Sequence, residues 1–176
     1  VLYISSEYGS MEKEKQDIIE RRNYLVDKFV KATPREVLDH LPSSIGEQFQ
    51  GEWALYSCSM FSAALTNISR LYPETAQDNL CYIQRLIDTV MSPELRAYDT
   101  SRWGEDALET LHGNKSHISY ISHLAWMICG YKSVGGDDRY DAVLSKLCET
   151  MNRRILSSPS LNLPTYPGES IYVPDM

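Results

Sequence analysis

The chain has 176 residues, of which 43% are hydrophobic and 23% charged, so it is long enough to bury one hydrophobic core. Its formal net charge of -7 disfavours nucleic acid and anionic membrane surfaces as partners, because phosphate groups select for clustered Lys and Arg. The basic pairs Arg21-Arg22 and Arg153-Arg154 fall in helical stretches and are assigned to solvated helix faces. Charged residues interrupt every apolar segment, which predicts a soluble chain without a membrane-spanning helix and leaves its localisation open.

Residues 1–46 are predicted to form N-terminal helices. Apolar side chains recur at helical spacing on one stripe of residues 11–32. Thr33 and Pro34 then start a second, short helix, in which Thr33 is the N-cap, Pro34 lies in the first turn and Glu36 completes a capping box.

Two helical hairpins are predicted after this region. Residues 51–72 and 115–134 are apolar around most of the helix circumference, which is typical of a helix buried on most sides. Residues 74–91 and 137–156 carry a narrower apolar stripe and are expected to lie outside them. Tyr72-Pro73 and Gly135-Gly136 supply the turns.

A long segment that opens with Ser-Pro follows each hairpin. We expect the first segment to be a loop that returns through a short helix at 105–111, and Gly113 to end that helix in a left-handed conformation. The second segment, 162–175, has no hydrophobic periodicity and is expected to be irregular. Long loops inside a compact domain are commonly functional, so both segments are candidate parts of a site.

The two hairpins and their loops are related by a spacing of 64 residues. Residues 47–114 therefore form the first predicted repeat and residues 115–176 the second, and neither buries its apolar face without its neighbour. The matched positions are Tyr56 and Tyr120, Leu80 and Leu144, Ile83 and Leu147, Ile87 and Met151, Met91 and Ile155, Gly104 and Gly168, and Glu105 and Glu169.

The four cysteines fall inside predicted helices, and none shows C-x-x-C spacing: Cys58, Cys81, Cys129 and Cys148. Zinc sites usually need paired ligands at short spacing, so we expect buried free thiols. His117 and His123 are six residues apart, which does not place them on one helix face as a metal-binding pair. The sequence predicts no metal site and no cofactor.

An inner helix, a tight turn, an outer helix and a long loop with aromatic residues and carboxylates resemble the successive hairpins of an (α/α) toroid, the fold of six-hairpin glycosidases and sugar epimerases. The resemblance covers about residues 47–176. Within it, residues 166–175 resemble the active-site loop of the linalool dehydratase/isomerase-like proteins, although Tyr166 and Asp175 stand where that group has two cysteines. His117 and Tyr120 match the helical histidine region of that group.

The resemblance implies an all-α chain of antiparallel helical hairpins that form part of an (α/α) toroid. A complete toroid has more hairpins than this chain, so residues 1–176 are interpreted as a single helical domain and as the N-terminal part of a larger ring. Alternatively, partner chains complete the ring in a homo-oligomer. In either case the resemblance places the loops at one mouth, where a substrate would bind.

Carboxylates are the candidate catalytic groups. Glu105 and Glu169 hold equivalent loop positions, with Asp175 near the second, and paired carboxylates can divide acid and base roles. His117 is a candidate proton carrier or, alternatively, a hydrogen-bonded buried histidine. For Glu105 the alternative is a charge that favours the first turn of a short helix.

Aromatic side chains near the predicted mouth are the candidate binding residues, because they join an apolar face to a polar group. They are equally compatible with a place in the core. The candidate substrate-binding residues are Trp53, Tyr56, Trp103, Asp106, Tyr120, Tyr166 and Tyr172.

Two functions remain open from the sequence. The first is an enzyme, hydrolase-like or epimerase/lyase-like, that acts on a carbohydrate or similar polar small molecule through carboxylate acid/base chemistry. The second is a non-catalytic helical-repeat module that binds another protein. Convergence of carboxylates and aromatic side chains in a concave pocket would indicate the enzyme, and their dispersal would indicate the module.

Overall fold

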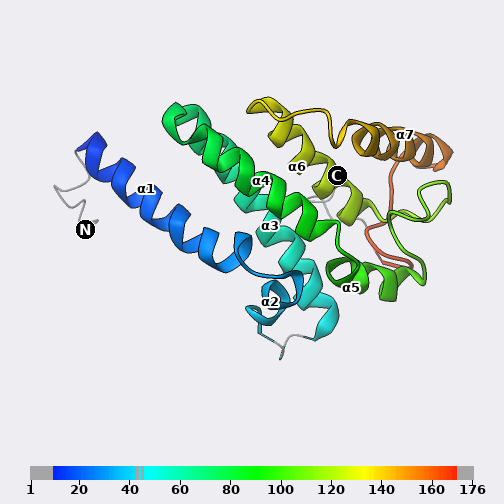
Figure 1. The fold of residues 1–176 in the computed structure, drawn as a ribbon. Coiled ribbons are helices and arrows are strands. Elements are labelled where there is room, and N and C mark those ends of the chain that lie inside the picture. Colours follow the sequence, from blue (N-terminus) through cyan, green and yellow to red (C-terminus); the bar gives the residue numbers. More distant parts are fainter. Residues whose placement is uncertain (1–9, 43, 45, 170–176) are drawn as a thin grey trace, which may run out of the picture.

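The computed structural model describes residues 10–42, 44 and 46–169, and this part of the chain contains helices and no strands, which confirms the all-α class (Figure 1). The elements are α1 (Met11–Leu25), the π-helical turn η2 (Val26–Val30), α2 (Pro34–Asp39), α3 (Glu47–Leu71), the short 3₁₀ helix η4 (Pro73–Thr75), α4 (Ala76–Val90), α5 (Pro93–Trp103), α6 (Ile118–Ser133) and α7 (Asp141–Ser157). No helix in the described ranges is both long and apolar enough to cross a membrane.

The N-terminal helices form as the sequence predicts. The α1 helix buries none of its residues, and the buried contacts of this region begin in η2 with Val26 and Val30. At the start of α2, the Thr33 hydroxyl accepts a hydrogen bond from the Glu36 backbone N–H, and the Glu36 carboxylate accepts one from the Thr33 backbone N–H at 2.7 Å. This reciprocal pair is the predicted capping box.

Helices α3 and α6 lie side by side and run parallel. Three side-chain contacts join them: Tyr56 with Ser119, Ser59 with His123, and Arg70 with Ser133. The two residues of each contact are 63, 64 and 63 positions apart, respectively. Because the separation in sequence between contacting residues stays nearly constant along both helices, the chain advances in the same direction in each and the helices are parallel. In an antiparallel pair this separation would change steadily from one contact to the next.

The core lies between α3, α4 and α6, with fully buried side chains such as Leu55, Ile83 and Leu124. Helix α4 packs against both α3 and α6, and α7 packs against α6. Nine of the 16 residues of α6 are buried, against three of 17 in α7, so α6 is the more central of the two. Gly135 adopts a φ of 98° in the turn between them, as its position predicts.

The segment after α4 differs from the expected loop. Residues 93–103 form helix α5, because the Ser92 hydroxyl accepts a hydrogen bond from the Leu95 backbone N–H and Pro93 occupies the first turn. The Ser-Pro pair is therefore a helix start rather than the start of a loop. The α5 helix packs against α3, where Gly51 leaves room for the Tyr98 side chain.

Residues 105–111 form turns, so the short helix expected there is wrong. The Asp106 carboxylate accepts hydrogen bonds from the backbone N–H groups of Leu108 and Glu109, which fixes a turn without continuing it into a helix. The left-handed glycine of this region is Gly104, with a φ of 75°, and it ends α5; Gly113 does not have a positive φ.

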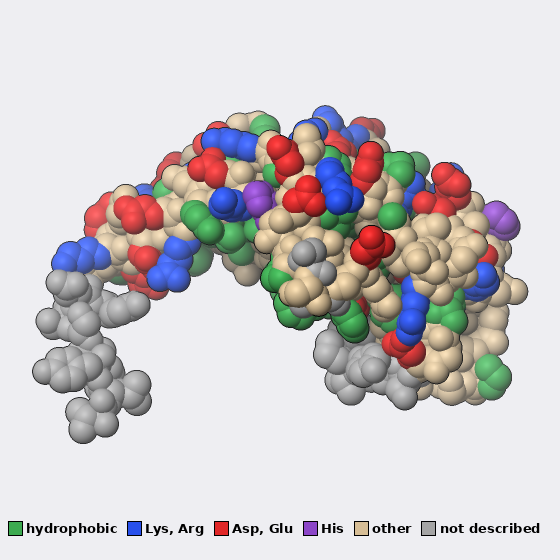
Figure 2. Space-filling model, turned by 90° about the horizontal axis from the view of Figure 1, so that it is seen from below, with side chains coloured by type: hydrophobic (Ala, Val, Ile, Leu, Met, Phe, Trp, Pro, Cys, Tyr) green, Lys and Arg blue, Asp and Glu red, His purple; other side chains and the backbone are tan. Residues whose placement is uncertain are grey.

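The cysteines also depart from expectation. Cys58 is buried, as predicted, but Cys81, Cys129 and Cys148 are exposed free thiols. They lie on α4, α6 and α7, each of which keeps a face outside the core. Seen from below, the molecule has an arched outline, and acidic and basic side chains intermingle along its convex edge without a basic patch on that face (Figure 2).

Candidate functional site

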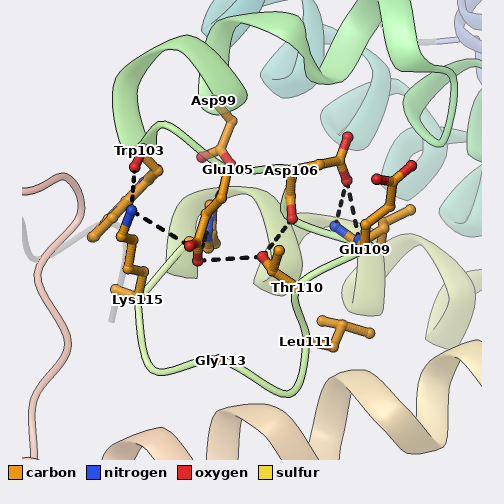
Figure 3. A network of polar contacts seen from close by, with 12 residues as sticks. Asp99, Trp103, Glu105, Asp106, Glu109, Thr110, Leu111, Gly113 and Lys115 are labelled. Carbon is orange, nitrogen blue, oxygen red and sulfur yellow. Dashed lines mark hydrogen bonds and ion pairs between the residues drawn. The ribbon is translucent and has the colours of Figure 1, made fainter.

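The polar network with the most buried charge lies where α5, the loop 104–117 and the start of α6 meet (Figure 3). Helix α5 supplies Asp99, the loop supplies Glu105, and His117 is the N-cap residue of α6. His117 has a φ of 47°, a left-handed conformation that is unusual for a residue other than glycine. Such backbone strain persists where the surrounding structure over-determines it, and it concentrates at functional sites.

The His117 ring lies between two carboxylates. Its Nδ1 is 2.5 Å from Asp99 Oδ2, and its Nε2 is 3.4 Å from Glu105 Oε1. A protonated ring donates to both oxygens, whereas a neutral ring donates through one nitrogen only. His117 and Asp99 are fully buried, while the Glu105 side chain is 25% exposed. Of these three groups, Glu105 is therefore the one that solvent or a ligand can reach.

Glu105 is held in its ionised form by its neighbours. Lys115 Nζ lies 3.4 Å from Glu105 Oε2, and the Thr110 hydroxyl donates to Oε1 at 3.3 Å. Partial burial acts to raise the pKa of Glu105, but hydrogen bonds from His117 and Lys115 outweigh burial and hold that pKa below its ordinary value. At neutral pH Glu105 is a carboxylate, which suits a base or an anionic ligand group better than an acid.

Asp99 shows the opposite tendency. Its burial raises its pKa, and the hydrogen bond from His117 opposes that rise only in part. Two carboxyl groups on the same imidazole ring therefore have pKa values displaced in opposite directions. Such a division is the usual basis for distinct proton-transfer roles within one site.

Two arginines of α7 shape the loop that carries this network. Arg154 is buried and donates to the backbone carbonyls of Thr110, Gly113 and Ser116 at 3.1, 3.1 and 2.8 Å, respectively. Arg153, its more exposed neighbour, donates to the Leu111 carbonyl at 2.6 Å. The assignment of this basic pair to a solvated face is wrong for Arg154, since the fold brings the loop carbonyls over it.

Asp106 has structural partners. Its Oδ1 lies 3.1 Å from Nη1 of the buried Arg96 and also accepts the backbone N–H groups that fix the following turn. The carboxylate is thus engaged by α5 and by its own turn, and the predicted role in substrate binding has no support from its contacts.

The second Gly-Glu loop lies against the end of α5. Gly168 has a φ of 76°, nearly equal to the φ of 75° at Gly104. In both loops a glycine in the left-handed conformation therefore precedes the glutamate. Glu169 forms an ion pair with Arg102, whose guanidinium also lies 5.5 Å from the centre of the Tyr166 ring. Arg102 directly precedes Trp103 and thereby ties the second loop to the segment that carries Glu105.

The aromatic candidates divide into buried and exposed groups. Trp103 is buried, and its ring lies 5.0 Å from the His117 ring; Tyr166 is also buried. Tyr120 is fully buried and donates its hydroxyl to the Val90 carbonyl, so it is a core residue rather than the predicted ligand contact. Its position faces α4, which covers that side of α6.

Trp53 and Tyr56 lie on α3, and the Tyr56 hydroxyl lies 3.3 Å from Ser119 Oγ, two residues after His117. Trp53 is exposed, and the half-buried Tyr56 ring packs 4.7 Å from the His123 ring. The predicted site residues Tyr172 and Asp175 lie outside the described residues. The structure thus brings Glu105, His117 and Trp103 together and joins Glu169 and Tyr166 to them through Arg102. Tyr56 contacts the start of α6 at Ser119, and Trp53 is exposed on α3.

Several buried polar atoms at this site have no hydrogen-bond partner within the protein. They are Asp99 Oδ1, Trp103 Nε1 and Tyr98 Oη. Buried polar groups in folded proteins are nearly always satisfied, so these atoms offer free hydrogen-bonding capacity to water or to a ligand. A cavity of about 310 Å³ lies beside one of them, Trp103, and is also lined by Lys115, Arg154 and residues 162–164.

Sequence reasoning missed Asp99, Lys115 and Arg154. Asp99 falls in a segment expected to be a loop, and nothing in its neighbours marks it as a partner of a histidine 18 residues later. Among the described residues no group of three or more His, Cys, Asp or Glu side chains could hold a metal ion. Comparison with protein-family models, with curated proteins and with solved structures finds no match to this chain.

Proposed function

We propose that this protein binds a neutral polar small molecule of the carbohydrate class and acts on it with Glu105 as general base. The observation that carries the proposal is the Asp99–His117–Glu105 chain. A partly exposed, ionised carboxylate stands at the end of two fully buried polar groups. Burial of a histidine and an aspartate costs free energy unless the two groups are hydrogen-bonded. The buried Asp99 and His117 therefore depend on each other and on Glu105 as partners.

Each residue has a distinct part in this proposal. Glu105 accepts a proton from the substrate or from an attacking water. His117 donates to Glu105 Oε1 and fixes the carboxylate, and Asp99 holds the imidazole ring from its other side. Lys115 stabilises negative charge next to Glu105 Oε2. The cavity between Trp103, Lys115 and residues 162–164 is the place for the substrate.

We also propose that the helices form part of an (α/α) toroid. The parallel, in-register pairing of α3 and α6 supports this, because the inner helices of such a ring are parallel neighbours. The outward positions of α4 and α7 and the shared left-handed glycines of the two Gly-Glu loops agree with it. The remainder of the ring would come from further chain or from a second copy.

The rival interpretation is a non-catalytic interaction module. Two observations favour the enzyme over it: the carboxylates and Trp103 converge on one histidine, and unpartnered buried polar atoms lie at the same place. A scaffold has no need for a strained histidine between two carboxylates.

The test compares Glu105→Gln with Glu109→Gln. Glu109 is exposed on the same loop, so the control changes the same charge a few residues away. Both variants and the wild type are assayed in two ways. Hydrolysis of 4-nitrophenyl glycosides is followed by release of 4-nitrophenol, and cleavage of soluble neutral polysaccharides is followed by the appearance of new reducing ends. We expect Glu105→Gln to lower turnover by about 100-fold or more and Glu109→Gln to leave it unchanged. Wild type without turnover on this panel, or full activity of Glu105→Gln, would overturn the proposal.

A further inference from the structure

A second candidate binding place lies between α3 and α6, beyond the contact of Ser59 with His123. The two helices enclose a groove of about 330 Å³ there. Its lining consists of Ser59, Ser62, Ala63, Thr66, Asn67, Arg70, Trp126, Met127, Cys129, Gly130 and Ser133. None of these residues lines the cavity beside Lys115, so the groove is separate from the His117 network.

The lining combines apolar surface with hydroxyl groups and is almost uncharged. Five hydroxyl and amide side chains alternate with apolar ones such as Ala63 and Met127, and the lining contains no carboxylate. Arg70 is the one charged residue, and its guanidinium donates to the Ser133 hydroxyl at 3.3 Å, at the far end of the groove. A groove of this kind discriminates against ions and suits a neutral molecule with several hydroxyl groups.

An aromatic face stands at the edge of this groove. The Trp126 side chain is 47% exposed although it lies on the largely buried helix α6. An exposed indole beside hydroxyl groups offers a flat apolar surface with polar partners next to it. That combination fits a pyranose ring, which has an apolar face and a hydroxylated edge.

One buried hydroxyl in the groove has unused hydrogen-bonding capacity. Ser62 is 1% exposed and lines the groove, and its Oγ has no hydrogen-bond partner. The neighbouring hydroxyls are engaged: Thr66 donates to the Ser62 carbonyl at 3.0 Å, and Ser59 contacts His123 Nδ1 at 2.8 Å. An unsatisfied buried hydroxyl is costly, so a ligand in the groove that hydrogen-bonds to Ser62 would remove that cost.

The floor of the groove is formed where α3 and α6 approach each other closely. A Cβ atom at Gly130 would lie 2.9 Å from Thr66 Oγ1, so glycine allows α6 to approach α3 at this point. Small side chains on both helices then leave the space above them open. The shape is thus fixed by two rigid helices rather than by loops, which favours a preformed site.

We propose that this groove is a subsite for one neutral sugar ring, with the ring's apolar face on Trp126 and a ring hydroxyl on Ser62. The choice of a sugar as the ligand rests on the proposed function, whereas the location of the subsite rests on the groove itself and on the unpartnered Ser62 hydroxyl.

The test uses fluorine NMR of protein labelled with 5-fluorotryptophan. The chain has three tryptophans, so one spectrum reports separately on Trp126 in the groove, on Trp103 beside His117 and on Trp53. Cellotetraose and maltotetraose are titrated to about 10 mM, enough to detect millimolar binding, with glycerol as a control solute. Trp126→Phe assigns the groove signal.

The expected result is a saturable shift of the Trp126 signal with one of the two sugars and none with glycerol. Ser62→Ala should weaken that binding about 5-fold, as the loss of one hydrogen bond implies. Ala63→Leu, which fills the groove, should abolish it. Ser145→Ala on the exposed face of α7 is the matched control and should bind as the wild type does. Unchanged Trp103 and Trp53 signals show that each variant is folded.

Other outcomes overturn the inference in distinguishable ways. A shift of Trp103 alone would remove the groove and leave the proposed function standing. No shift of Trp126 with either sugar, or an equal shift with glycerol, would remove the groove as a sugar subsite. The Trp126 shift should persist in Glu105→Gln, so loss of turnover in that variant together with intact binding separates the two proposals.

Discussion

Replacement of Arg154 by Met should destabilise the protein more than the same replacement of its partly exposed neighbour, Arg153. Arg154 is the buried residue that holds three loop carbonyls, those of Thr110, Gly113 and Ser116. Methionine keeps the apolar stem of the side chain and removes every donor. The loop that carries Glu105 and His117 then loses its attachment to α7.

The magnitude follows from the three acceptors. The Ser116 carbonyl bond is buried and the other two are partly buried. A buried carbonyl left without a donor costs about 1–3 kcal/mol, and a partly buried one about 1 kcal/mol, because water replaces the lost donor there. Removal of the buried guanidinium itself returns part of this, since burial lowers the pKa of Arg154 to about 10. We expect a net loss of roughly 2–4 kcal/mol in the free energy of unfolding.

Urea unfolding followed by circular dichroism measures this loss, with Arg153→Met as the matched control. Arg153 also donates to loop carbonyls but is partly exposed, so its replacement should cost about 1 kcal/mol. An equal cost for the two variants would refute the reasoning, because it would show that burial of the Arg154 bonds does not decide their contribution.

Three further predictions concern the site and its support. Glu105→Gln should remove a part of the free energy of unfolding that depends on pH. The pKa of Glu105 is lower in the folded than in the unfolded state, so its ionised carboxylate stabilises the fold above about pH 4.5. This stabilisation is lost as pH falls through the folded pKa. The urea midpoints of wild type and variant should therefore approach each other as pH falls below about 4.5 and coincide below the folded pKa, and a constant difference would contradict this. His117→Val should be less stable than His117→Asn by about 1–2 kcal/mol, because a β-branched residue tolerates a φ of 47° poorly; thermal unfolding of the pair tests it, and equal stability would show that the backbone relaxes. Gly51→Ala should destabilise by about 1–3 kcal/mol despite the helix preference of alanine, since its Cβ would lie 2.4 Å from Tyr98 Cβ; a higher melting temperature would show that α5 moves aside freely.

Local sequence signals predicted most of the helices. The capping box at Thr33, the apolar pattern of α3 and α6 and the turn at Gly135 depend on interactions within a few residues, so they can be read from the chain directly. The Ser92-Pro93 signal was also present, but a helix start and a loop start share it, and the sparse apolar pattern of α5 favoured the loop.

The candidate site was only partly predictable. Glu105 and His117 stood out because of the repeated Gly-Glu pair and the ordinary pKa of histidine. Asp99 did not, because its role exists only after α5 places it 2.5 Å from a ring nitrogen of His117. Tyr120 and Asp106 were assigned to ligand binding from their positions, and packing against α4 and α5 gave them structural partners.

The sequence by itself therefore determined the helical class and the four helices of the two hairpins, since hydrophobic periodicity and capping are local. Only the tertiary structure decided which polar groups are paired, buried or left accessible. Arg154 is the plain case: an arginine pair on a helix reads as solvated until a loop 40 residues earlier lies across it. Contacts between distant residues depend on how whole helices pack, and a single sequence carries no direct record of them.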